Sequence, residues 1–129
     1  SRIGYMLQQD HLFEWRSIRR NVLLGPEINH ILSSEHKKLA DRLLKDYGLD
    51  KFQYKRPCEL SGGMKQRAAL IRTMLMHPKL LLLDEPTAAM GIREAYQTME
   101  LLRRLRAEGH TLLIVSHDIY QVFDIADRV

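Results

Sequence analysis

The sequence has little cysteine, little proline and no long hydrophobic run. Its single cysteine, Cys58, excludes an internal disulfide, so a reducing compartment such as the cytosol is the default setting. No apolar run exceeds four residues, far fewer than the roughly 20 that span a bilayer. The opening stretch, SRIGYMLQQD, lacks the long apolar segment of a secretory signal peptide. These absences predict a chain that neither crosses a membrane nor is exported, and they leave a peripheral role at a membrane open.

The composition suits one globular domain or a piece of a larger one. The 129 residues are 45% hydrophobic and 28% charged, with a net charge of +4. The basic residues recur in short groups, without a recognition motif or interleaved aromatic residues. We therefore expect no nucleic-acid partner.

The apolar pattern predicts strands that alternate with helices. The expected strands are residues 2–7, 80–83 and 111–116, and the expected helices are residues 34–47, 62–76, 92–107 and 118–129. The leucines of residues 80–83 and the apolar run at 112–115 indicate strands buried on both faces of a parallel sheet. Residues 10–30 are expected to be irregular, with a Gly25-Pro26 breaker.

This order predicts an α/β fold in three parts. Residues 1–9 and 77–129 form the parallel-sheet core, and residues 10–76 form an inserted helical subdomain.

The stretch LSGGMKQR places a serine and two glycines at the start of a helix. Ser61 is expected to cap the helix, and its hydroxyl can bond a phosphate oxygen instead. Gly62 and Gly63 let the backbone approach an anion closely, and the free N–H groups of the first turn point to the same spot. An ordinary serine-capped helix with glycines in the turn is the alternative interpretation.

The stretch LLLLDEP ends a buried strand in two acids, Asp84 and Glu85. Open α/β sheets bind their ligands at this edge, and adjacent strand residues point to opposite sides. One acid can therefore face a metal-bound nucleotide while the other faces an attacking water. Mg²⁺ prefers oxygen ligands, so Asp84 is the expected ligand, directly or through water. Two acids in a turn at a strand end remain the alternative.

Two further residues follow strands in the same way. His117 follows the strand of residues 111–116, where an imidazole can bond a terminal phosphate or a water. Gln8 ends the first strand, where its amide oxygen can reach a metal or a water, and Gln9 is the expected bystander. The other five histidines lack this context, and we expect them to be surface or packing residues.

Taken together, these stretches resemble one family. The chain is similar to the ATP-binding subunit of ATP-binding-cassette (ABC) transporters, which has a P-loop NTPase fold. LSGGMKQR resembles the family signature, LLLLDEP the Walker B strand, YMLQ the Q-loop and VSHD the switch-histidine stretch. The order and spacing of the four motifs agree over nearly the whole chain.

The resemblance implies a role for each residue at the sheet edge. Glu85 would be the general base that orients the hydrolytic water, and Asp84 would hold Mg²⁺ through water. Gln8 would contact Mg²⁺ and respond to the transmembrane partner. His117 would contact the γ-phosphate of ATP.

The resemblance also implies partners. Ser61, Gly62 and Gly63 would bind the γ-phosphate of ATP held by the opposite subunit of a head-to-tail dimer. Transmembrane permease subunits would contact the segment with Phe13 and Trp15. The chain would then be cytoplasmic and peripheral on the inner face of the cell membrane.

Two features depart from the family pattern. No G-x-x-x-x-G-K-[ST] phosphate loop occurs in the chain. We expect this loop to lie before Ser1, so the chain is predicted to be a fragment that is inactive alone. Gly91 stands where many members have an aspartate that reaches the other subunit.

Two stretches of the sequence resemble importers of different solutes, so they disagree about the transported solute. EPTAAMG is similar to monosaccharide importers, whereas DHLFEWRSIRRNVLLG is similar to importers of nitrate, sulfonate and taurine. A mosaic sequence or simple divergence explains both, and import is the expected direction. Two alternatives remain: an ABC relative in DNA repair or translation, and a non-catalytic module that lends its signature to a complete ATPase subunit.

Overall fold

The computed structural model describes residues 3–6, 10–87 and 90–128. Three strands and six α-helices are present in these ranges. The strands are β1 (Ile3–Met6), β2 (Leu80–Asp84) and β3 (Thr111–Val115). The helices are α1 (Ile18–Val22), α2 (Leu24–Ile28), α3 (Ser34–Asp46), α4 (Gly62–Met74), α5 (Ile92–Ala107) and α6 (Ile119–Ile125).

The strands form one parallel sheet in the order β1-β2-β3. In register, Ile3 pairs with Leu80 and Leu80 pairs with Thr111. Parallel neighbours need crossover connections, and helices supply both: α1 to α4 lie between β1 and β2, and α5 lies between β2 and β3. The predicted α/β fold with a parallel sheet is confirmed.

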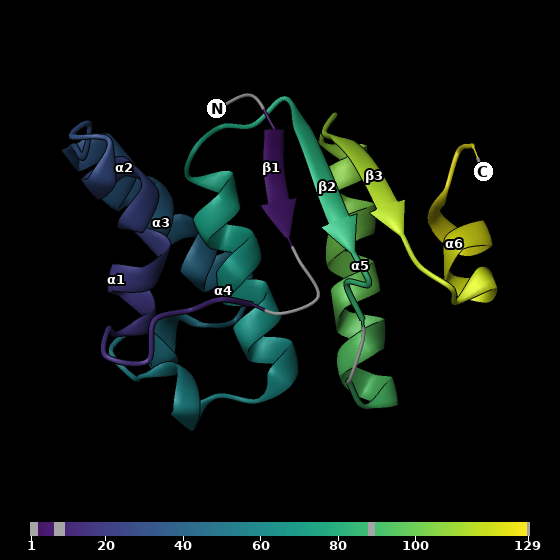
Figure 1. Cartoon of the computed structure of the whole chain (residues 1–129), viewed down its shortest axis with the longest axis horizontal. Coiled ribbons are helices and arrows are strands. Elements are labelled where there is room, and N and C mark those ends of the chain that lie inside the picture. Colours follow the sequence, from purple (N-terminus) through teal and green to yellow (C-terminus); the bar gives the residue numbers. More distant parts are fainter. Residues whose placement is uncertain (1–2, 7–9, 88–89, 129) are drawn as a thin grey trace.

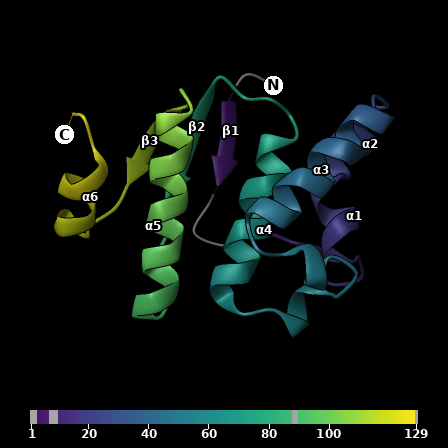
Figure 2. The same ribbon diagram turned by 180° about the vertical axis from the view of Figure 1, so that it is seen from behind.

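Helices cover one face of this sheet. Figure 1 shows the three strands in front of α5, and Figure 2, seen from behind, shows α5 lying across β2 and β3. Buried leucines of the two layers, such as Leu83 of β2 and Leu102 of α5, belong to one hydrophobic core. No helix in the described part of the chain lies over the front face of Figure 1.

The prediction that β3 is a buried strand is wrong. None of its five residues is buried, and Leu113 and Val115 are 53% and 52% exposed. The reason is its place in the sheet: β3 is an edge strand whose front face has no covering layer in the described ranges. The strand β2, between two neighbours, buries Leu81 and Leu83.

The second layer of the core lies among α1, α3 and α4. Ile18, Leu44 and Ile71 are completely buried there, which explains the helical spacing of apolar residues in these segments. The helix α3 ends at Asp46, and Gly48 adopts a φ of 74°, the left-handed conformation in which a glycine commonly follows the end of a helix.

The prediction that residues 10–30 are irregular is wrong for the second half of this range, which forms α1 and α2. Ser17 caps α1, because its Oγ accepts a hydrogen bond from the Arg20 N–H at 3.2 Å. Pro26 lies in the first turn of α2, where a missing N–H breaks no helical hydrogen bond. Both helices have only five residues, too few to show a period in the sequence.

Candidate functional site

The carboxyl edge of the sheet carries the two predicted acids. Asp84 is the last residue of β2 and pairs in register with Val115 of β3. Glu85 follows with a φ of 45°, in the left-handed region that few residues other than glycine adopt. Its N–H donates to the Val115 carbonyl at 2.7 Å, which extends the ladder by one bond. The turn therefore holds Glu85 firmly against the end of β3.

Glu85 and His117 are in direct contact, as expected from the neighbouring ends of their strands. The Glu85 Oε1 lies 2.5 Å from His117 Nδ1 and accepts a hydrogen bond from the His117 N–H at 3.1 Å. The Ser116 hydroxyl lies 3.5 Å from the other carboxylate oxygen. The Glu85 side chain is 15% exposed and that of His117 is 92% exposed. A largely shielded carboxylate thus orients an imidazole that faces solvent.

This pair lines an open pocket of 620 Å³. Thr87, Met90 and Asp118 also contribute to its wall. A carboxylate in such a position can accept a proton from a water, and the imidazole can donate a hydrogen bond to an anionic oxygen. The arrangement suits hydrolysis of a group that carries negative charge.

Asp84 and Glu85 fit a metal ion that is also bound by phosphate oxygens and waters better than a metal ion bound by protein side chains alone. Among the described residues, no group of three or more His, Cys, Asp or Glu side chains can hold a metal ion. Mg²⁺ in nucleotide sites takes one or two carboxylates, waters and phosphate oxygens. Asp84, partly exposed at the strand end, fits that role. Gln8, the other predicted metal ligand, lies outside the described residues, as does Gln9.

We call Ser61, Gly62 and Gly63, at the N-terminus of α4, the helix mouth, and it has the predicted geometry. Ser61 is the N-cap of α4, and its Oγ accepts a hydrogen bond from the Met64 N–H at 3.2 Å. Ser61 and Gly62 are exposed, whereas Gly63 is buried. Within the described ranges, the hydrogen bonds at this helix start join Ser61 to Met64 and Gly63 to Glu94, whereas Glu85 and His117 contact each other.

Glu94, which the sequence did not single out, contacts this mouth. Its Oε2 accepts a hydrogen bond from the Gly63 N–H at 3.3 Å. Glu94 belongs to the first turn of α5, which lies beside α4. The residues are 31 positions apart, and no local pattern signals such a contact.

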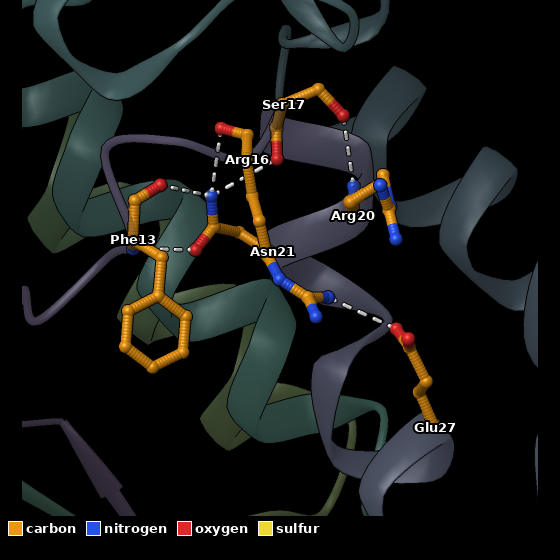
Figure 3. Close-up of polar contacts among 6 residues, drawn as sticks. All are labelled: Phe13, Arg16, Ser17, Arg20, Asn21 and Glu27. Carbon is orange, nitrogen blue, oxygen red and sulfur yellow. Dashed lines mark hydrogen bonds and ion pairs between the residues drawn. The ribbon is translucent and has the colours of Figure 1, made fainter.

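The segment before α1 carries two stacked aromatic rings. The ring centroids of Phe13 and Trp15 lie 4.7 Å apart, and Trp15 is 68% exposed. The completely buried Asn21 holds this segment, as Figure 3 shows. Its amide oxygen accepts from the Phe13 N–H at 2.8 Å, and its amide nitrogen donates to the carbonyls of Phe13, Arg16 and Ser17 at 3.0–3.2 Å.

The same segment is tied to α4 and to the turn before it. Arg72 of α4 donates to the carbonyls of Asp10 and His11 at 2.8 and 3.1 Å. Burial lowers the pKa of the Arg72 guanidinium, and Asp10 raises it. Glu14 accepts from the Cys58 N–H at 3.1 Å, three residues before Ser61. The aromatic segment and the helix mouth are therefore parts of one packed unit.

The sequence comparisons identify the family to which this site belongs. The family model described as ABC transporter matches residues 1–88, more than half of the chain. The chain belongs to the ABC transporter family, and the predicted resemblance is confirmed.

Similar proteins match nearly the whole chain. An uncharacterized ABC transporter ATP-binding protein of Bacillus subtilis, YtlC, is 47% identical over 98% of the chain. A sulfate/thiosulfate import ATP-binding protein of Nocardia farcinica is 40% identical, and a taurine import ATP-binding protein of Roseobacter denitrificans is 36% identical, each over 98% of the chain. The chain covers 49%, 39% and 47% of these relatives, respectively.

Proposed function

We propose that the chain is part of the ATP-hydrolysing subunit of an ABC transporter and couples ATP hydrolysis to solute import. The contact between Glu85 and His117 at the carboxyl edge of the sheet is the observation that supports this most strongly. A purely structural domain has no need for a carboxylate held in a left-handed turn against an exposed imidazole. The names of the sulfate/thiosulfate and taurine import relatives favour import, and we assign no cargo.

Glu85 acts as the general base in this proposal. It orients the water that attacks the terminal phosphate and accepts its proton, and the exposed His117 donates a hydrogen bond to a γ-phosphate oxygen. Asp84 and Gln8 hold Mg²⁺, which neutralises charge on the phosphates when it is bound.

In this proposal the helix mouth binds a second ATP molecule, which is not the one beside Glu85. Ser61, Gly62 and Gly63 bind the γ-phosphate of ATP held by the opposite subunit in a head-to-tail dimer. The support is the capped, glycine-lined N-terminus of α4, which offers N–H donors and a positive dipole end.

Permease subunits are the proposed membrane partners. The stacked pair of Phe13 and Trp15 offers them an exposed aromatic surface, and the protein then lies peripherally on the inner face of the membrane. No helix among the described residues is long and apolar enough to cross a membrane itself.

The phosphate loop is proposed to come from another part of the same subunit. The sequence has no G-x-x-x-x-G-K-[ST], and the chain spans about half of the relatives' length. A helix N-terminus contributes about 0.3–1 kcal/mol to anion binding, and up to ~2 kcal/mol when partly buried. A Kd of about 1 mM already needs about 4.1 kcal/mol. The chain alone therefore neither binds ATP usefully nor hydrolyses it.

The mutation Glu85→Gln tests this function in the subunit extended upstream to include a phosphate loop. Loss of the general base is expected to lower kcat for ATP hydrolysis by about 100-fold or more, with ATP binding retained, as measured by phosphate release and nucleotide titration. The exposed Glu108 gives the matched control, and Glu108→Gln is expected to leave kcat unchanged.

A Glu85→Gln subunit that hydrolyses ATP at the rate of the unmutated subunit contradicts the proposal. That result favours the second candidate, a non-catalytic module that lends its helix mouth to a complete ATPase subunit. The absence of a phosphate-loop motif from the chain is the observation in favour of that candidate.

A further inference from the structure

A carboxylate occupies the helix mouth that is proposed to bind phosphate. Glu94 Oε2 lies 3.3 Å from the Gly63 nitrogen. A Cβ atom on Gly63 would come within 2.9 Å of the Glu94 Cδ and 3.1 Å of its Oε2. A larger residue at this position would force the Glu94 side chain to shift, so the two residues form a close packing contact.

The surroundings suit a negative charge at this point. The first turn of α4 contains no acidic residue of its own, and the N–H groups there lack helical partners. The Ser61 hydroxyl accepts a hydrogen bond from the Met64 N–H, and the Glu94 carboxylate accepts one from the Gly63 N–H. Arg67, one turn along the helix, is close enough that Glu94 raises its pKa against the lowering effect of burial. Glu94 thus lies where both the helix dipole and a cation favour an anion.

We propose that Glu94 is an internal substitute for phosphate that nucleotide must displace before it binds Gly63. The inference rests on the proposed role of Ser61, Gly62 and Gly63. A phosphate and a carboxylate cannot share the Gly63 N–H closely, because two like charges in contact repel each other. Glu94 thereby sets the affinity of the helix mouth for the nucleotide of the opposite subunit.

A phosphate titration of the ¹⁵N-labelled chain tests this. The Gly63 amide signal reports inorganic phosphate binding, at constant pH and ionic strength. The mutation Glu94→Gln keeps an acceptor but removes the charge, and Glu94→Ala removes both. We expect either variant to bind phosphate at Gly63 about threefold more tightly or better, since a charge at a helix N-terminus is worth up to about tenfold.

The control is Glu35→Gln. Glu35 is the acidic residue in the first turn of α3, so this variant makes the same charge change at another helix start. It is expected to leave the phosphate affinity of Gly63 unchanged.

Three results would overturn the proposal: equal phosphate affinities in the unmutated chain and both Glu94 variants, an equal gain in Glu35→Gln, or no phosphate-dependent shift of the Gly63 signal in any variant. None of these changes the dependence of ATP hydrolysis on Glu85, so failure of this inference is distinguishable from failure of the proposed function.

Discussion

At the residue scale, the backbone of Glu85 decides what its carboxylate can do. The left-handed φ of 45° costs a residue with a Cβ atom roughly 1–2 kcal/mol. The hydrogen bond to Val115 and the contacts with Ser116 and His117 hold the conformation in place. The sequence was sufficient to predict that acids and histidine meet at one sheet edge. It did not reveal the turn, because the left-handed conformation at a glutamate has no sequence signal.

Tyr47 gives a prediction about pH. Burial of its side chain, followed by the nearby charge of Glu108, raises the pKa of Tyr47 to about 12 from a usual value of 10.0. The folded state therefore disfavours the ionised phenol. The contribution of this shift to folding stability is complete below about pH 10 and is lost as the pH rises toward about 12, with an upper size of about 3 kcal/mol.

Tyr47→Phe is expected to flatten this alkaline loss of stability. The free energy of unfolding, measured in urea at about pH 9 and about pH 11, should differ less in Tyr47→Phe than in the unmutated chain. Tyr54, 76% exposed, supplies the control: Tyr54→Phe should keep the original difference. An unchanged difference in Tyr47→Phe would show that Tyr47 ionises equally easily in both states.

At the element scale, Asn21 joins the aromatic segment to α1. Asn21→Ala removes four hydrogen bonds and leaves the Phe13 N–H without its acceptor. We expect a loss of about 2–4 kcal/mol in the free energy of unfolding. Trp15 is the single tryptophan of the chain, so its fluorescence emission should also shift before global unfolding.

Asn29 is the matched control for this prediction. It is exposed, and its side-chain amide donates a hydrogen bond to the Gly25 carbonyl at 2.8 Å. The change Asn29→Ala should cost no more than about 0.5 kcal/mol. Similar losses in the two variants, measured by urea unfolding, would contradict the role of Asn21.

The elements differ in how well their sequence predicts them. The helix Ile92–Ala107 has the predicted bounds, because its apolar positions repeat over several turns. The helices α1 and α2 were missed, since five residues hold too little of a period. The contact between Gly63 and Glu94 depends on how α4 packs against α5, which periodicity does not describe.

At the scale of the whole molecule, the described helices cover one face of the sheet. The burial of Leu81 and Leu83 was predictable from the leucine run, whereas the exposure of Leu113 and Val115 was not. The sequence of β3 resembles a buried strand because it is suited to two packed faces.

Titration with MgATP tests the central claim most directly. The 129-residue chain is compared with the same chain extended upstream to include a phosphate loop, by isothermal calorimetry. We expect no saturable binding below about 1 mM for the chain alone, because a helix N-terminus contributes too little, and submillimolar binding for the extended subunit. Submillimolar binding of ATP by the chain alone would contradict the account.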